Sequence, residues 1–377
     1  MAVLPFAPTK SPIRIGFLSP HNPYDRCSFS GTAFFAAKAL QGRPELAVRV
    51  LGHRPARFSD RLLRRPSPRI SVDMLDLSDL DIVLGLVATP LLDDLAQQHP
   101  DMPFLHVTDA TPAYLRDVYG WNIPFTADAA EARVAEKAAI TIYSSEKIAR
   151  RACRDLDLPA LDHAVVPFGV NMDKLPEACP QKAALGELKL LFVGVDWERK
   201  GGDIAVAILD ELRASGLPAH LTVIGALPDR HRAHPGITHT GFLAKSRRAD
   251  TERLVAAYED AHFLLLPSRG DCTPMVVAEA MSFGVPVLSS DVGGLSELVG
   301  GPGTGRVLPR YSPPGNWAAE IRGIISDPIA YSMMSDACFD RARSLLNWDQ
   351  WAGTIADISR DGLRTGRERG LKAATGT

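Results

Sequence analysis

The stretch FLLLPSRGDCTPMVVAEAMSFGVPVLSSDVGG, residues 263–294, decides the fold of this chain. Its apolar start, FLLLP, predicts a buried strand that is followed by a loop. Thr273 is suited to be a helix N-cap, Pro274 to be the first helical residue and Gly284 to end that helix. A second apolar strand then follows. A strand, a crossover helix and another apolar strand form the repeating unit of a parallel sheet covered by helices on both faces.

The same alternation of short apolar strands and helical patterns runs along the whole chain. Strands are expected at 13–19, 47–52, 82–88, 104–108, 139–144, 164–167, 189–194, 221–225, 263–267 and 285–289. Helices are expected at 32–40, 129–137, 146–156, 203–215, 251–260 and 274–283. The pattern predicts two doubly wound α/β domains, residues 1–168 and 169–347, whose sheets face a central cleft. A helix at about 348–363, with an apolar stripe for packing, joins the N-terminal domain, and a flexible tail is expected at 364–377.

The composition is that of an ordinary globular protein. Of the 377 residues, 46% are hydrophobic and 23% are charged. Lys and Arg number 42 against 44 Asp and Glu, and the resulting net charge of −2 argues against nucleic acid as the main partner. The five cysteines are far apart and have no metal-ligand spacing. With no recognisable signal peptide and no run of about 20 apolar residues, a cytoplasmic protein without a membrane span is expected.

The helix start inside residues 263–294 carries the chemistry. Its first amides, at Met275 and Val276, lie at the carboxyl edge of the predicted sheet and favour an anion such as a phosphate. Two acids flank this start, Asp271 in the loop and Glu279 in the second turn of the helix. Acids beside a phosphate site are unfavourable unless they bind something else, and sugar hydroxyls are good partners for them. The combination indicates a nucleotide-sugar site.

The stretch resembles the signature of the retaining glycosyltransferases of family 4, which have the GT-B fold of two Rossmann-like domains. In that signature two glutamates separated by seven residues are followed by A-M-x-x-G-x-P-V and D-x-G-G. The matching residues here are Asp271, Glu279-Ala280-Met281, Gly284, Pro286-Val287 and Asp291-Val292-Gly293-Gly294. Further matches keep the order of the family: Ser30-Gly31, His106, Ser144-Ser145-Glu146, residues 166–171, FVGVDWERKGG at 192–202 with Lys200, Gly225 and Gly241-Phe242. The resemblance covers about 188–310 most closely.

Two residues depart from the family pattern. Asp271 stands where the family has the first glutamate, and Val195 stands where it has a phosphate-binding arginine. Arg199, next to Lys200, is the candidate for supplying the missing charge. The departures put donor choice and catalytic efficiency in question.

The resemblance implies transfer of a sugar from a nucleotide-sugar donor to an acceptor hydroxyl, with retention of configuration and without a metal or cofactor. Lys200, Arg199 and the helix start are expected to stabilise the leaving phosphates. The resemblance assigns Glu279 to the donor ribose, Asp271 to the hexose hydroxyls and His106 to the sugar. The predicted catalytic residues are therefore Lys200, Asp271 and His106, and the predicted donor-binding residues are Gly31, Arg199, Lys200, Gly225, Phe242, Asp271, Thr273, Met275, Val276 and Glu279. The acceptor can be a carbohydrate, a lipid-linked molecule or a small molecule.

Other interpretations stay open at this point. A GT-B sugar-nucleotide epimerase or a catalytically weak sugar-nucleotide binder would share these motifs, and a two-lobed solute-binding protein would share the α/β halves. For single residues the structural alternatives are a solvated Lys200 that opens the next helix, a hydrogen-bonded His106 without a catalytic role and a turn at Gly31.

Three further patterns are weaker. Asp79-Leu80-Asp81 matches a metal-binding DxD motif but precedes a strand, and His231, His234 and His239 lack a matching carboxylate or cysteine pattern, so no metal is expected. Residues 54–69 hold six arginines and one acid. Such a segment is usually a solvent-exposed face of the protein. The alternative is that it binds anionic lipid at the inner membrane face, or an anionic acceptor carrier.

Overall fold

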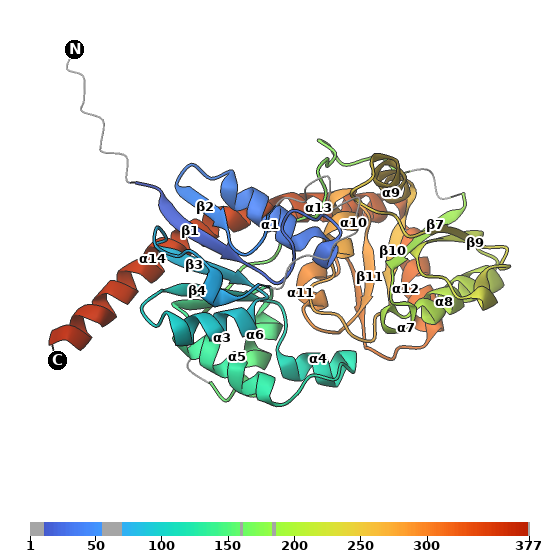
Figure 1. Cartoon of the computed structure of the whole chain (residues 1–377). Coiled ribbons are helices and arrows are strands. Elements are labelled where there is room, and N and C mark those ends of the chain that lie inside the picture. Colours follow the sequence, from blue (N-terminus) through green and yellow to red (C-terminus); the bar gives the residue numbers. More distant parts are fainter. Residues whose placement is uncertain (1–10, 55–69, 159–160, 183–185, 376–377) are drawn as a thin grey trace, which may run out of the picture.

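The computed structural model describes residues 11–54, 70–158, 161–182 and 186–375, and the side chains up to residue 364. The chain forms two lobes, each built around a parallel six-stranded sheet with helices on both faces (Figure 1). The strand orders are β2-β1-β3-β4-β5-β6 and β12-β11-β10-β7-β8-β9. Both orders place the first strand of the lobe inside the sheet, which is the doubly wound arrangement that the alternation of strands and helices predicts.

The N-terminal sheet is formed by β1 (Ile13–Leu18), β2 (Leu46–Val50), β3 (Ile82–Leu86), β4 (Phe104–Thr108), β5 (Ile140–Tyr143) and β6 (His163–Val165). Its helices are α1 (Thr32–Gln41), α3 (Thr89–Gln98), α4 (Pro112–Tyr119), α5 (Thr126–Lys137) and α6 (Glu146–Asp155). The central strands β3 and β4 are buried along their whole length. They are continuous apolar runs apart from Gly85, His106 and Thr108, as expected for strands covered on both faces.

The C-terminal sheet is formed by β7 (Leu188–Gly194), β8 (Ala219–Gly225), β9 (Ile237–Gly241), β10 (Phe263–Leu266), β11 (Val287–Ser290) and β12 (Gly305–Leu308). Its helices are α7 (Trp197–Lys200), α8 (Gly202–Ala214), α9 (Arg248–Asp260), α10 (Met275–Ser282), α11 (Leu295–Val299), α12 (Pro314–Ile325) and α13 (Pro328–Leu345). The sequence pattern did not predict β9, β12, α3, α4, α7, α11, α12 or α13. The two edge strands were missed because neither has a continuous apolar run: β9 (ITHTG) is largely polar, and β12 (GRVL) begins with a glycine and an arginine.

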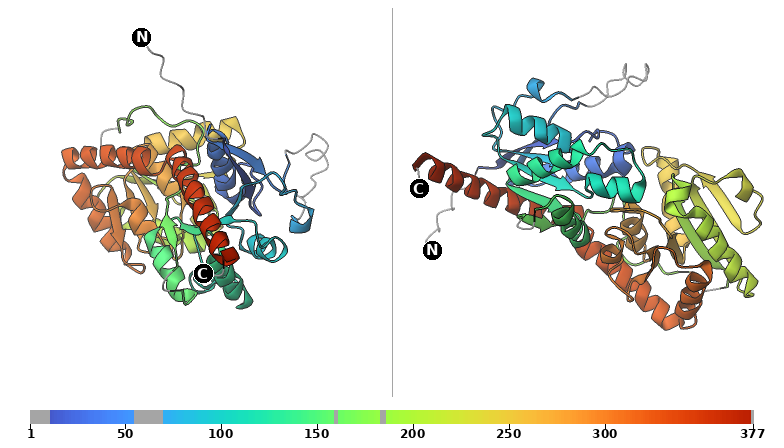
Figure 2. Two further views of the ribbon diagram at one scale, coloured as in Figure 1. Left: turned by 90° about the vertical axis from the view of Figure 1, so that its left-hand side faces the viewer. Right: turned by 90° about the horizontal axis from the view of Figure 1, so that it is seen from below.

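The last helix, α14 (Trp348–Thr375), leaves the C-terminal lobe and runs along the N-terminal lobe (Figure 2). Its stripe of Trp348, Trp351 and Ile355 is buried in the core under the N-terminal sheet, which confirms the prediction that these aromatic residues pack. The backbone of α14 stays helical through Thr375, and the flexibility expected of the tail from residue 364 stays a prediction. That segment is rich in strong helix formers and contains no proline.

Polar contacts join the two lobes on the side of the facing sheet edges. The Glu297 carboxylate accepts hydrogen bonds from the amides of Glu146 and Lys147 at 2.7 and 2.8 Å, where it meets the start of α6. A negative charge at a helix N-terminus is favourable, so this contact fixes the two lobes relative to one another. Ser144 Oγ and Thr273 Oγ1, 2.6 Å apart, add a second bond across the boundary.

Candidate functional site

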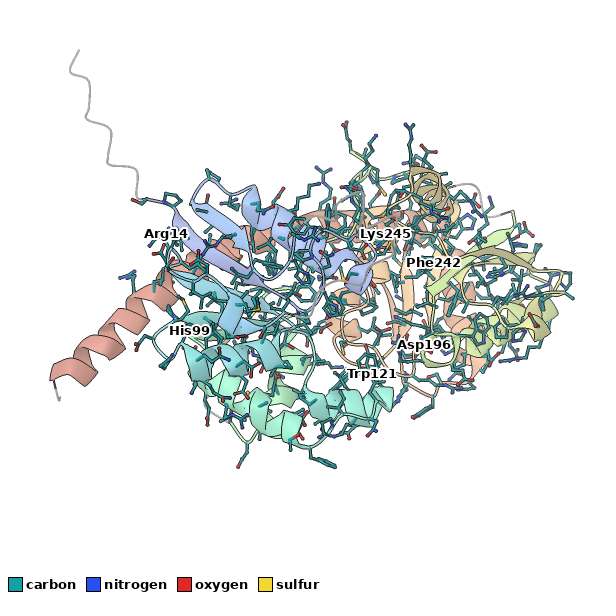
Figure 3. The ribbon with its side chains drawn as sticks, in the orientation of Figure 1. Arg14, His99, Trp121, Asp196, Phe242 and Lys245 are labelled. Atoms are coloured by element: carbon teal, nitrogen blue, oxygen red, sulfur yellow. The ribbon has the colours of Figure 1, made fainter. Side chains whose placement is uncertain are left out.

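A cavity of about 420 Å³ lies between the two lobes, at the carboxyl ends of both sheets. Residues that follow β4, β7, β8 and β10 line it, together with the first turn of α10. Trp121 from the N-terminal lobe, and Phe242 and Lys245 from the C-terminal lobe, lie near the boundary between the lobes (Figure 3). Ligands bind at this edge in open α/β sheets, so the cavity is the candidate site.

Most of the residues that the sequence singled out meet in this cavity. Its lining includes Arg199, Lys200, Gly225, Phe242, Asp271, Thr273, Met275, Val276 and Glu279. They come from separate segments of the C-terminal lobe, and the parallel strand order brings those segments together at one sheet edge. Gly31 and His106 are not among the lining residues.

The Lys200 ammonium and the Asp271 carboxylate form one buried ion pair, with Nζ and Oδ2 2.6 Å apart. Asp271 is 4% exposed, and Ser268 donates a second hydrogen bond to the same oxygen at 3.1 Å. The backbone carbonyl of Asp271 accepts a hydrogen bond from the Tyr114 hydroxyl of α4 at 2.6 Å. The loop after β10 is therefore held from both lobes.

A second ion pair joins the Glu279 carboxylate of α10 to the Lys245 ammonium. Glu279 is 1% exposed and also accepts a hydrogen bond from the Tyr258 hydroxyl at 2.9 Å. Burial, followed by the charge of Glu279, raises the pKa of Tyr258, so this hydroxyl stays protonated and able to donate. Lys245 is a site residue that the sequence analysis missed, because its partner is 34 positions further along the chain.

Arg199 lines the cavity, but its guanidinium already has several partners. Nε donates to Asp196 at 2.9 Å and Nη1 donates to the Gly270 carbonyl at 2.9 Å. Its Cζ lies 4.6 Å from the centre of the Tyr119 ring, a cation–π contact across the lobe boundary. Arg199 thus braces the loop before Asp271, and the phosphate role suggested for it would require these bonds to rearrange.

The helix α10 starts one residue later than the sequence predicted. Pro274, with φ −70° and ψ 112°, is the N-cap and makes no side-chain capping bond, so the predicted cap at Thr273 is wrong. The extended ψ of Pro274 keeps it outside the helix, which begins at Met275. The amides of Met275 and Val276 still belong to the first turn, where backbone N–H groups have no partner within the helix. Gly284, with φ +64°, follows the C-cap as predicted.

His106, which the family resemblance assigns to the sugar, does not line the cavity in the structure. His106 lies within β4, opposite Thr141 of β5, and its side chain is fully buried. Its Nε2 is 3.6 Å from Oε1 of Glu131 on α5, and burial lowers the pKa of His106 to about 4. The imidazole is therefore a neutral core group, as in the structural alternative.

Gly31 forms the turn into α1. Its φ of +90° follows two other left-handed residues, Phe29 and Ser30. A Cβ on Gly31 would lie 2.9 Å from the Arg26 carbonyl oxygen, so only glycine fits here without strain. Its neighbours Ser30 and Thr32 line the cavity.

The N-terminal lobe adds residues that the sequence analysis did not find: Arg26, Asp109, Tyr119 and Trp121 line the cavity. The Tyr119 hydroxyl accepts a hydrogen bond from the backbone amide of Cys272 at 3.0 Å. Tyr119 was missed because α4 was not predicted. A signal existed for Asp109, since it directly follows the predicted strand at 104–108.

The weaker sequence patterns have structural explanations. Asp81 of the DxD pattern pairs with Arg14 at 2.7 Å, outside the cavity lining. His231 pairs with Asp203 at 2.7 Å, and no group of three His, Cys, Asp or Glu suited to a metal ion occurs in the described part of the chain. Residues 55–69 lie outside the described residues, so lipid attraction of the arginine-rich segment 54–69 stays a prediction. No helix among the described residues is long and apolar enough to cross a membrane.

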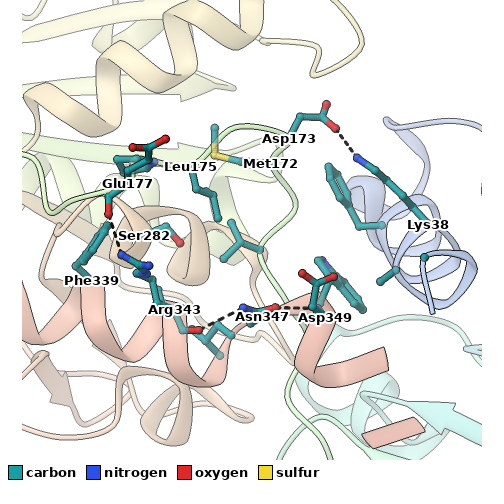
Figure 4. Close-up of a pocket in the computed structure, with 18 residues that line it drawn as sticks. Lys38, Met172, Asp173, Leu175, Glu177, Ser282, Phe339, Arg343, Asn347 and Asp349 are labelled. Atoms are coloured by element: carbon teal, nitrogen blue, oxygen red, sulfur yellow. Dashed lines mark hydrogen bonds and ion pairs between the residues drawn. The ribbon is translucent and has the colours of Figure 1, made fainter. Parts of the chain in front are cut away.

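A larger hollow of about 910 Å³ lies where the chain crosses between the lobes (Figure 4). Cationic side chains there already have partners: Lys38 pairs with Asp173 at 3.2 Å, and Arg343 donates to the backbone carbonyl of Glu177 at 2.8 Å. No residue singled out by the sequence as catalytic or donor-binding lines this hollow.

Comparison with known proteins agrees with the geometry. Residues 187–327 match the family described as glycosyl transferases group 1. The chain is 29% identical over 201 residues to a glycogen synthase of Mycobacterium tuberculosis, covering 52% of this chain and 47% of the relative. It is 27% identical over 230 residues to a D-inositol 3-phosphate glycosyltransferase of Segniliparus rotundus, covering 56% of this chain and 50% of the relative. The chain spans about half the length of these curated relatives.

Solved structures match over nearly the whole chain. Sucrose-phosphate synthase from Thermosynechococcus elongatus has a TM-score of 0.69 at 17% identity, covering 93% of this chain and 98% of that one. HepE from Anabaena, in complex with UDP and glucose, has a TM-score of 0.61 at 15% identity, covering 93% of this chain and 100% of that one. These matches confirm the predicted GT-B fold.

Proposed function

From the premise that this chain belongs to the group 1 glycosyltransferases of family 4, we propose that it transfers a sugar from a nucleotide-sugar donor to an acceptor hydroxyl. The proposal rests on the cavity at the facing sheet edges. The first turn of α10 lines this cavity, and a buried acid–lysine pair lies on each side of that turn. The start of α10 can bind a phosphate, and a carboxylate is fixed on each side of it. A nucleotide sugar suits this arrangement, because its phosphates lie between two rings that carry hydroxyls.

The donor is assigned to the C-terminal lobe. The leaving diphosphate binds the amides of Met275 and Val276 and the Lys200 ammonium, which aim positive charge at the oxygens where negative charge develops. Glu279, held by Lys245 and Tyr258, accepts hydrogen bonds from the ribose hydroxyls. Phe242 is 64% exposed and offers a flat ring to the base. Because the HepE structure holds UDP and glucose, a UDP-sugar is the first donor to test.

In the reaction the acceptor oxygen forms a bond to the anomeric carbon, and the bond from that carbon to the phosphate oxygen breaks. The diphosphate leaves with the electron pair, and the proton of the acceptor hydroxyl ends on the phosphate. Asp271 orients the hexose hydroxyls while its pairing with Lys200 keeps both charges next to the leaving group. We assign retention of configuration to this step, and we assign to Lys200 and the α10 amides the charge stabilisation for which a metal-dependent enzyme uses a cation.

The donor assignment is tested by thermal shift with UDP, GDP, ADP and their glucose conjugates. We expect one nucleotide series to raise the melting temperature of the wild type, since ligand at about 100 times its Kd adds roughly 2.7 kcal/mol to stability. Glu279→Gln should reduce that shift, whereas Asp210→Asn, an exposed change outside the cavity lining, should keep it. Stabilisation by none of the nucleotides would contradict the proposal.

The same samples separate transfer from isomerisation. After incubation with the stabilising nucleotide sugar alone, proton NMR should show an unchanged hexose. An epimerised hexose would favour the rival epimerase function instead.

A further inference from the structure

A third carboxylate lines the cavity and is not explained by the donor site. Asp109 directly follows β4, so it belongs to the N-terminal lobe, opposite the donor half. The two acids of the lining that act on the donor, Asp271 and Glu279, each pair with a lysine. Among the described residues no cationic side chain forms an ion pair with Asp109, which lines the cavity together with Thr273.

The groups that face Asp109 are mostly acidic or neutral. Asp271 and Cys272 come from the loop after β10, and Tyr119 comes from α4. The guanidinium of Arg199, which lines the same cavity, is bound to Asp196, Gly270 and the Tyr119 ring, and it lies 3.7 Å from the Asp271 carboxylate. Burial, followed by the charge of Asp271, raises the pKa of Asp109 to about 6. An ionised carboxylate in such surroundings has an unfavourable free energy unless a ligand donates a hydrogen bond to it.

The chemistry of the cavity limits what that ligand group can be. A phosphate is excluded as the partner of Asp109, since two anions would repel at this depth. A hydroxyl is suited to it, because an ionised carboxylate is an acceptor and a hydroxyl can donate. Perturbed carboxylates in clefts are typical of functional sites.

The position of Asp109 indicates which hydroxyl this is. It lines the same cavity as Thr273, two residues before the first residue of α10, and the leaving phosphate is assigned to the start of that helix. In a transfer with retention, the acceptor hydroxyl approaches from the face that the leaving phosphate occupies. A hydroxyl bound to Asp109 would therefore reach the anomeric carbon on the required side.

We propose that Asp109 is a catalytic residue that binds the reacting hydroxyl of the acceptor. This inference rests on the proposed function. In the step, the carboxylate accepts the hydroxyl proton while the acceptor oxygen bonds to the anomeric carbon and the diphosphate leaves with its electron pair. The proton then passes from Asp109 to the departing phosphate, which leaves the carboxylate ionised for the next turnover. Asp109 is thus the contribution of the N-terminal lobe to the chemistry.

The test measures UDP release from UDP-glucose with D-inositol 3-phosphate and with glycogen as acceptors, in wild type, Asp109→Asn and Asp109→Glu. Asp117→Asn is the matched control, since Asp117 is an exposed acid of the same lobe outside the cavity lining. We expect Asp109→Asn to lower kcat about 100-fold or more, as loss of general base catalysis does. Its Kd for UDP should stay within about twofold of the wild type, as expected when donor contacts are intact.

The pH profile separates a catalytic from a structural role. Wild-type kcat should fall as the pH drops below about 6, where Asp109 becomes protonated. This acid limb should persist in Asp109→Glu and vanish in Asp109→Asn. Wild-type kcat in Asp109→Asn, or equal loss of UDP affinity and kcat, would overturn the inference. A wild type that binds no nucleotide and transfers no sugar would instead overturn the proposed function.

Discussion

Glu131 gives the sharpest test of the electrostatics of the N-terminal lobe. It lies on α5 with 2% exposure, and its Oε2 accepts a hydrogen bond from the Thr89 hydroxyl at 2.6 Å. Its neighbour His106 is neutral above about pH 4, because burial lowers its pKa, so it supplies no positive charge at neutral pH. Burial raises the pKa of Glu131 from 4.5 to about 7.

The sign of the effect on stability follows from proton linkage. The folded state keeps a proton on Glu131 at pH values where the unfolded state has lost it. The contribution of Glu131 to the free energy of unfolding is therefore full below pH 4.5 and declines as the pH rises through about 7. Since a tenfold change in proton affinity corresponds to about 1.4 kcal/mol, the ionised carboxylate costs on the order of 3 kcal/mol above pH 7.

Glu131→Gln removes this cost and keeps an oxygen for the Thr89 hydroxyl. We expect the variant to be more stable than the wild type at pH 8, by about 1 to 3 kcal/mol, and close to it at pH 5. Urea unfolding followed by circular dichroism at the two pH values measures the difference. Glu136→Gln, an exposed change on the same helix, is the control and should match the wild type at both. If Glu131→Gln differed from the wild type by the same amount at pH 5 and pH 8, ionisation of Glu131 could not be the cause.

Three further predictions concern the site and the lobe junction. Lys200→Ala should lower kcat about 100-fold at saturating donor, since it removes charge from the leaving group; wild-type kcat would contradict the assignment. Treatment with EDTA should leave turnover unchanged, and loss of activity that Mg²⁺ restores would exclude the metal-independent step. Trp348→Ala should lower the free energy of unfolding by about 3 to 5 kcal/mol, because the ring is buried against Phe168 and Trp351. An unfolding midpoint unchanged from the wild type would contradict the packing role of Trp348.

The sequence predicted fully buried strands, and the helix between two of them, close to their observed bounds. The strands β10 and β11 and the helix α10 between them lie within two residues of their predicted bounds. Buried strands leave long apolar runs, and a helix that ends at glycine leaves a local signal. The missed helices α12 and α13 begin at Pro314 and Pro328, which the sequence analysis did not use as first-turn prolines.

His106 and Asp109 show how the position relative to the end of a strand decides which residue reaches the cavity. Both belong to one short segment at β4, and the strand itself was predicted with the observed bounds. A side chain within the strand packs against the helices that cover the sheet, whereas the residue after the strand reaches the sheet edge. The family resemblance favoured the histidine, and the position relative to the strand end would have favoured the acid.

Lys245 could not be predicted from the sequence for a different reason. Its ammonium neutralises the buried Glu279, yet it lies in a loop between β9 and α9 among other basic residues. Nothing local separates Lys245 from Arg247 or Arg248, because the pairing depends on how far the loop folds back over α10. Only the tertiary structure supplies that information.

Product analysis is the most direct test of sugar transfer in the cavity between the lobes. The wild type is incubated with UDP-glucose carrying ¹³C at the anomeric carbon and with D-inositol 3-phosphate or glycogen, and the anomeric signal is followed by NMR. We expect a new glucoside whose anomeric configuration is that of the donor, with UDP released in equal amount. A product of inverted configuration, or no product from any UDP, GDP or ADP sugar that the protein binds, would contradict transfer with retention at this site.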